Sequence, residues 1–256
     1  MQINRFYLDQ IVFDQFGIQK LPGDISKQLI YVLRSQINDQ VVLFDGTGYE
    51  YRVQIIDVSN KICSVKLLEK VSIDYQNKIH VTIFLSLIKQ NRFENALQKC
   101  TELGAVAFVP FYSSRSKYQL DKESSSIGKN KIVRWESIIK EASEQCGRSD
   151  IPNLFDPISF ELVCKKAQDS FSIILWENEQ KTNLKSILKG FRDDRKDNES
   201  SINIIVGPEG GFSPDEIMFA SNKGIKSGSL GNLILRSETA AISAISNIFY
   251  ELSETI

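Results

Sequence analysis

From His80 to the end of the chain, apolar stretches of strand length alternate with amphipathic stretches of helical length, and this alternation limits the possible folds more than any other feature. Residues 80–88 predict a buried strand, 91–104 a helix and 105–112 a second buried strand. Alternation of this kind is typical of a sheet whose parallel strands are joined by crossover helices. The second part of the chain therefore predicts an α/β domain.

Signals at the ends of the stretches place the helices. We expect Asn91 to be the N-cap of the first helix, Glu94 to complete a capping box and Gly104 to end the helix. A long helix is predicted to end at Gly147, and the charged stretch 191–201 is predicted to be a surface loop. Further helices are predicted over 161–167 and near 183–188.

The first 70 residues read differently, as short strands separated by turn signals. Strands are predicted over 7–13, 39–46, 49–57 and 62–69. One helix, over 25–36, interrupts them, with Leu29, Ile30 and Leu33 on its inner face and Lys27 and Arg34 outside. This pattern predicts a small β-barrel over residues 1–72, followed by the α/β domain over 73–256.

Composition excludes several classes of protein. The 256 residues include one histidine and four cysteines, with no CxxC pair, which disfavours zinc sites and catalytic triads. No stretch approaches the roughly 20 apolar residues that a membrane span needs, and the N-terminus has no apolar signal region. We therefore expect a cytoplasmic protein that uses no metal and contacts no membrane.

Charge is uneven along the chain. The formal net charge is −1, but residues 89–148 carry 11 lysines and arginines against 7 acidic residues. A local basic surface is what contacts to nucleic-acid phosphates require. A solvated helix face would explain the same count equally well.

Two glycine-bearing loops near the C-terminus follow predicted strands: GPEGGF (207–212) and LGNLILRSETAA (230–241). Open α/β sheets bind ligands at such strand ends. Ser213, Pro214 and Glu216 predict a capped helix directly after the first loop. Either loop alone could be only a turn, but two adjacent loops predict a pocket. Neither GxGxxG nor GxxxxGK[ST] occurs, which disfavours a dinucleotide-binding fold and a P-loop.

These loops, with NRFENALQKCTELG, VPFYSSRS and EASEQCGR in the same order, resemble the ribosomal small-subunit methyltransferase E family of the SPOUT superfamily. The N-terminal segments RFYL, YVLR and VVLFDG also resemble that family. The resemblance implies an N-terminal PUA-like β-barrel, a C-terminal α/β trefoil-knot domain, a homodimer and S-adenosyl-L-methionine (SAM) as cofactor. The implied reaction is methylation of uridine N3 in 16S ribosomal RNA, free or in the small ribosomal subunit.

The resemblance also implies which residues bind the cofactor. They belong to the two loops, joined by one residue at the end of an earlier strand: Leu175, Gly207, Pro208, Glu209, Gly211, Leu230, Gly231, Ile234, Leu235, Arg236, Thr239 and Ala240. The sequence departs from the family's pattern at two places that are expected to contact RNA. Lys27 and Gln28 stand where relatives often have histidine, and Ser114-Arg115-Ser116 replaces Glu-Arg-Ser.

Methylation at uracil N3 requires loss of a weakly acidic proton, so cations near the imide oxygens would help. We expect Arg92 or Arg236 to supply this charge and Glu209 or Glu144 to accept the proton. Arg92 could equally be a surface residue, and Glu144 a partner of Lys140 or Arg148.

Contacts with RNA phosphates are expected from basic residues of the barrel and of the middle segment: Arg5, Lys27, Arg34, Lys99, Arg115, Arg134 and Arg148. Two other functions stay open: a SPOUT enzyme that methylates a ribose 2′-OH, and an RNA-binding protein without catalytic activity.

Overall fold

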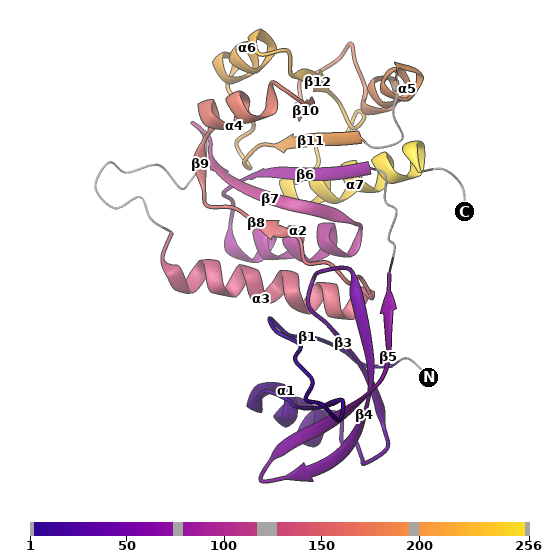
Figure 1. Cartoon of the computed structure of the whole chain (residues 1–256). Coiled ribbons are helices and arrows are strands. Elements are labelled where there is room, and N and C mark those ends of the chain that lie inside the picture. Colours follow the sequence, from indigo (N-terminus) through magenta and orange to yellow (C-terminus); the bar gives the residue numbers. More distant parts are fainter. Residues whose placement is uncertain (1–2, 74–78, 117–126, 195–199, 254–256) are drawn as a thin grey trace. The chain divides into compact units, whose positions relative to one another are not determined.

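The computed structural model describes residues 3–73, 79–116, 127–194 and 200–253 (Figure 1). The chain divides into two compact units. One contains the chain up to residue 76 together with Ser143–Ile151, and the other contains 77–142 and the chain from Pro152 onward. No helix in the described ranges is long and apolar enough to cross a membrane.

The first unit is built on a five-stranded sheet in the order β1-β3-β4-β5-β2. Its strands are β1 (Arg5–Tyr7), β2 (Ile18–Lys20), β3 (Gln40–Phe44), β4 (Tyr49–Ser59) and β5 (Ile62–Ser72). β1 pairs with β3 in parallel, and the other pairs are antiparallel. Leu29, Leu43, Val53 and Val65 are fully buried in its core.

The helix predicted over 25–36 is shorter and irregular. α1 (Gly23–Lys27) continues as a π-helical turn (Gln28–Val32), and Arg34 then takes a left-handed backbone with φ 53°. Because the helix stops there, Leu33 does not reach the core and is 37% exposed. Similarly, the strand predicted over 7–13 ends at Tyr7, and β2 was not predicted at all.

Ser143–Ile151 joins the first unit through polar contacts that local sequence patterns do not reveal. Arg5 Nη2 lies 2.6 Å from Glu50 Oε1 and 3.0 Å from Ser149 Oγ, and Ser149 Oγ donates to the same carboxylate. Glu144 Oε1 accepts a 2.8 Å hydrogen bond from the backbone N–H of Tyr7. These contacts stabilise the end of β1.

The second unit contains a seven-stranded parallel sheet in the order β12-β10-β11-β6-β7-β8, with β9 also paired to β7. Its strands are β6 (Ile79–Ser86), β7 (Ala105–Tyr112), β8 (Asn153–Leu154), β9 (Ile158–Ser159), β10 (Phe171–Leu175), β11 (Ser200–Val206) and β12 (Lys226–Gly228). Its helices are α2 (Gln90–Glu102), α3 (Lys129–Cys146), whose last residues belong to the first unit, α4 (Phe160–Ala167), α5 (Leu184–Asp194), α6 (Pro214–Asn222) and α7 (Ser237–Leu252). The parallel sheet predicted from the alternation is confirmed.

Two predicted helix ends were wrong. α2 begins at Gln90, with Lys89 as N-cap, so Asn91 lies inside the helix and Glu94 forms no capping box. α5 continues through the predicted loop to Asp194, because the Phe191 ring packs on Phe171 with centroids 4.2 Å apart. Within 191–201, residues 195–199 lie outside the described chain. By contrast, the predicted capping box of α6 is present in full.

The chain after β12 lies alongside a segment that is distant in sequence, β10 and the residues that follow it. β12 pairs with β10, and Ser229 then exchanges backbone hydrogen bonds with Thr182 and Leu184. α7 next packs against α2 and against β6 and β11 (Figure 1). This pairing brings the loop after β12 beside the loops after β10 and β11, and residues from all three line one pocket.

Candidate cofactor-binding site

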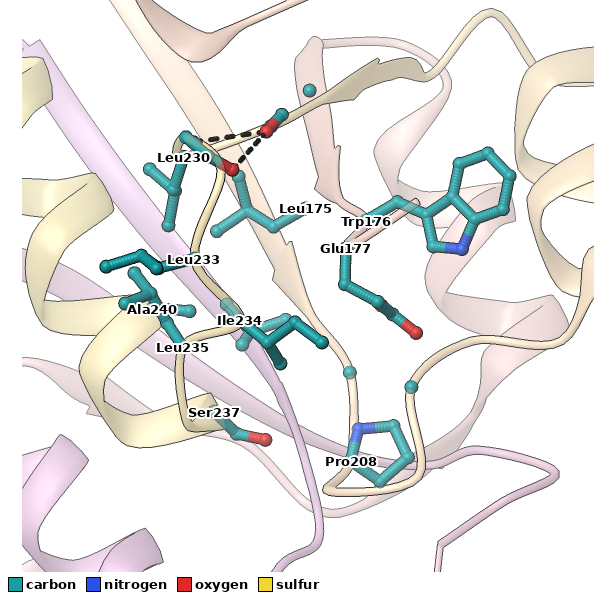
Figure 2. A pocket seen from close by; sticks show the side chains of 16 residues that line it. Leu175, Trp176, Glu177, Pro208, Leu230, Leu233, Ile234, Leu235, Ser237 and Ala240 are labelled. Atoms are coloured by element: carbon teal, nitrogen blue, oxygen red, sulfur yellow. Dashed lines mark hydrogen bonds between the residues drawn. The ribbon is translucent and has the colours of Figure 1, made fainter. Parts of the chain in front are cut away.

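A pocket of about 510 Å³, open to solvent, lies where β10, β11 and β12 end (Figure 2). It is lined by residues from the three loops and from the start of α7: Leu175, Trp176, Glu177, Val206, Gly207, Pro208, Gly211, Gly228, Ser229, Leu230, Gly231, Leu233, Ile234, Leu235, Ser237 and Ala240.

The first loop is shaped by two glycines. A Cβ on Gly207 would lie 2.9 Å from the buried ring of Phe212, which anchors the loop in the core. Gly211 has φ +68°, and its N–H bonds the carbonyl of Pro208. A Cβ on Gly211 would overlap the carboxylate of Glu177. Packing against the Phe212 ring therefore favours glycine at position 207, and the positive φ favours glycine at position 211, where an added Cβ would also displace the Glu177 side chain.

Glu216 connects this loop to the end of β7. Its buried carboxylate accepts hydrogen bonds from Ser113 Oγ, Ser114 N, Ser114 Oγ and Ser213 N, each between 2.8 and 2.9 Å. Burial alone would raise the pKa of Glu216, but these hydrogen bonds hold it below its usual value. The Ser114-Arg115-Ser116 segment thereby supports the pocket, and Arg115 packs on Gly210.

Replacing Glu216 with Gln is expected to lower the free energy of unfolding by about 2–4 kcal/mol, because an amide cannot accept all four hydrogen bonds. The pKa is lower in the folded state. The carboxylate's contribution is therefore present above the unfolded value near 4.5 and is lost as pH falls through the folded value. Urea titrations between pH 3 and 7 should show a flatter acid limb for Glu216→Gln than for the wild type. Equal slopes would contradict this role.

The second loop is held by Ser229 and leaves its apolar residues in solvent. Ser229 Oγ accepts from the N–H of Gly231 and donates to its carbonyl. Gly231 has φ +123°, a conformation available to glycine. Leu233 and Ile234 line the pocket but are 82% and 83% exposed.

Nine of the twelve residues proposed for cofactor binding line the pocket: Leu175, Gly207, Pro208, Gly211, Leu230, Gly231, Ile234, Leu235 and Ala240. Glu209, Arg236 and Thr239 belong to the same loops but do not line it. The sequence did not indicate Trp176, Glu177, Val206, Gly228, Ser229, Leu233 or Ser237, although each is adjacent to a predicted strand end or helix start.

Two of the four catalytic candidates lie together. Arg92 Nη1 is 3.6 Å from Glu209 Oε1, and Arg92 Nε is 3.7 Å from Glu238 Oε1 at the start of α7. Arg236 is exposed and is the N-cap residue of α7. Glu144 belongs to the other unit, where its carboxylate accepts the N–H of Tyr7, and its assignment as proton acceptor stays a prediction.

The RNA candidates divide into exposed and paired cations. Lys27, Arg34 and Arg115 are exposed. The other four lie against acidic side chains: Arg5 with Glu50, Lys99 with Glu102, Arg134 with Glu94, and Arg148 with Asp150. Lys27, Arg34 and Arg115 are therefore better placed for phosphate contacts, and the contacts of all seven stay predictions. Among the residues with described positions, no group of three or more His, Cys, Asp or Glu side chains is placed to hold a metal ion.

Known proteins share both the sequence and the fold. A family model described as an RNA methyltransferase domain matches residues 75–249, and one described as an RNA methyltransferase PUA domain matches 21–68. Ribosomal RNA small subunit methyltransferase E from Rickettsia conorii is 33% identical over 97% of this chain and 96% of its own length. The Bacillus subtilis protein of that name is 32% identical over 90% of this chain and 89% of its own.

Two solved structures carry SAM. A putative methyltransferase from Legionella pneumophila, in complex with SAM, has a TM-score of 0.84 and 29% identity, and covers 98% of both chains. Ribosomal RNA small subunit methyltransferase E from Neisseria gonorrhoeae, also bound to SAM, has a TM-score of 0.82 and 27% identity, and covers 97% of this chain and 98% of its own. The expected fold class, a PUA-like domain before a SPOUT α/β domain, is confirmed. This chain belongs to the ribosomal RNA small subunit methyltransferase E family.

Proposed function

We propose that this protein is a SAM-dependent methyltransferase of 16S ribosomal RNA in the small subunit, acting at uridine N3 in the cytoplasm. The observation that carries the proposal is the pocket at the ends of β10, β11 and β12. The solved relatives that bind SAM share this fold over nearly the whole chain.

The residues that line the pocket suit the chemistry of SAM. Its walls combine apolar side chains such as Leu175, Leu230 and Leu235 with glycines, which let a ligand approach the backbone closely. Apolar walls suit the faces of an adenine ring. Bound there, SAM would supply a methyl group on a positively charged sulfur.

The chain's own residues would prepare the RNA base. Proton loss from uracil N3 leaves negative charge on the ring oxygens, which a guanidinium can stabilise. Arg92 lies beside the first cofactor loop through its contact with Glu209, and Arg236 follows directly after pocket residue Leu235. We assign this stabilising role to Arg92, with Arg236 as the second candidate, and proton acceptance to Glu209.

Nucleoside mass spectrometry tests the reaction. Small subunits from cells that lack this protein would be incubated with the purified chain and SAM, and their RNA digested to nucleosides. We expect N3-methyluridine to appear. A 2′-O-methylated nucleoside would instead identify a ribose methyltransferase, and no methylation despite SAM binding would indicate an RNA-binding protein without this activity.

RNA binding should depend on the exposed cations. Replacing Lys27, Arg34 or Arg115 with Ala is expected to weaken binding and to reduce the slope of log K against log salt by about 1 for each lost phosphate contact. Arg134→Ala is the matched control, because Arg134 is already paired with Glu94. Filter binding at several salt concentrations measures both the RNA affinity and its dependence on salt. A slope unchanged in all three variants would contradict phosphate contacts at these positions.

We infer that the protein is a homodimer. Leu233, Ile234 and Tyr250, in the second loop and in α7, are 82–88% exposed, and burying such apolar side chains would stabilise a protein interface. Light scattering at micromolar concentration should give twice the 29.1 kDa chain mass. A monomer mass would contradict it.

A further inference from the structure

The pocket contains one ionisable side chain among its described lining residues, and it is the carboxylate of Glu177. Glu177 lies two residues beyond the end of β10, and its side chain projects between the two loops (Figure 2). The other lining residues are apolar, glycine or hydroxyl-bearing, apart from the indole of Trp176. The charge inside the site is therefore negative.

The first loop leaves space for this carboxylate. A Cβ on Gly211 would overlap Glu177 Oε1 and lie 2.8 Å from Glu177 Cδ, so the bare backbone of Gly211 is what admits the side chain. Within the part of the chain that the structure describes, the Glu177 carboxylate has no hydrogen bond or ion pair. Glu179, two residues later, instead accepts the backbone N–H groups of Lys181 and Thr182. Glu177 is thus available to a ligand.

Glu177 is exposed to solvent. A ligand that fills the pocket would displace part of the water around this carboxylate, and a cation on the ligand would offset that loss. SAM carries two cations, the α-ammonium of its methionine part and the sulfonium. The ammonium offers N–H donors, whereas the sulfonium offers none. A carboxylate at the sulfonium would also stabilise a charge that disappears on methyl transfer, which would slow the reaction.

We propose that Glu177 binds the α-ammonium group of the cofactor and so fixes the methionine end of SAM between the two loops. This inference rests on the proposed function, since it concerns how the same site recognises its cofactor. It assigns a role to a residue that the sequence did not indicate.

Calorimetry with three ligands tests the proposed contact between Glu177 and the α-ammonium group. SAM has both cations, S-adenosylhomocysteine has the ammonium alone, and 5′-methylthioadenosine has neither but keeps the ribose and adenine. In Glu177→Gln, affinity for SAM and for S-adenosylhomocysteine should fall by a similar factor of about 10 to 100. Affinity for 5′-methylthioadenosine should stay within about twofold of wild type. Glu136→Gln, at an exposed position on α3, is the matched control and should bind all three normally.

Each other result overturns the inference. Unchanged affinities would show that Glu177 does not recognise the cofactor. Weaker binding of SAM alone would place Glu177 at the sulfonium. Weaker binding of all three ligands would place it at the nucleoside. Glu177→Asp keeps the charge with a shorter side chain and should lie between wild type and Glu177→Gln. Thermal unfolding of the variants checks that the fold is intact. Failure of the wild type to bind SAM would contradict the proposed function instead.

Discussion

Replacing Gly211 with Ala is expected to reduce SAM affinity by about 10- to 100-fold. Alanine at φ +68° is strained, and its Cβ would overlap the Glu177 carboxylate, so either the loop or Glu177 must move. Strain of this kind costs about 1–3 kcal/mol. Binding would have to restore the original loop geometry against that cost, which corresponds to the stated loss of affinity. Calorimetric titration with SAM measures the loss directly.

Two controls separate backbone strain from overlap. Gly190→Ala, inside α5 with no atom near the added Cβ, should leave SAM affinity unchanged and stabilise the protein slightly. The double variant Gly211→Ala with Glu177→Ala removes the overlap but keeps the strained φ. Its melting temperature should exceed that of Gly211→Ala alone. If the two melt together, the overlap with Glu177 is not a source of the destabilisation.

Features encoded by neighbouring residues could be predicted from the sequence. The capping box of α6 depends on Ser213 and Glu216, which are three positions apart. The succession of strand, loop and helix around each glycine loop follows from the local hydrophobic pattern. The resemblance to a known family indicated nine pocket residues, eight in these two loops and Leu175 at the end of an earlier strand. The sequence identified Gly207 and Gly211 as loop residues. It did not show that the Phe212 ring and the Glu177 carboxylate lie against them.

Features that depend on distant contacts could not be predicted. α5 continues to Asp194 because Phe191 meets Phe171, twenty positions earlier in the chain. Glu177 reads locally as one of several acidic residues after a strand, and only the approach of Gly211 shows that it enters the pocket. The resemblance placed Leu175 and Gly211 in one site, but it did not indicate that the Glu177 side chain enters that site.

The pairing of the basic residues also depends on contacts that the sequence does not show. Counting cations along residues 89–148 indicated a basic segment, but Arg134 and Arg148 neutralise Glu94 and Asp150. Arg5 likewise lies against Glu50, with a side chain only 15% exposed. A charge count does not distinguish a cation that holds the fold together from one that faces solvent.

Replacing Arg92 with Ala is expected to lower kcat for methyl transfer by about 10²- to 10³-fold, the usual effect of removing one group that stabilises developing negative charge. Arg92 does not line the pocket, so SAM affinity should change by less than about threefold. Single-turnover methylation with saturating SAM, together with SAM titration, measures the two effects separately. Arg92→Lys keeps the positive charge without the planar fork and should retain part of the activity.

Arg92 also has a structural role that must be separated from catalysis. It lies between Glu209 of the first loop and Glu238 of α7, and the Glu238 side chain is only 9% exposed. Glu238 Oε2 is buried and has no hydrogen-bond partner in the described chain, so losing the adjacent cation should destabilise the fold by about 1–3 kcal/mol. Adding Glu238→Gln to Arg92→Ala should restore stability but not turnover. If turnover returns with stability, Arg92 only holds the two loops together and has no part in the chemistry.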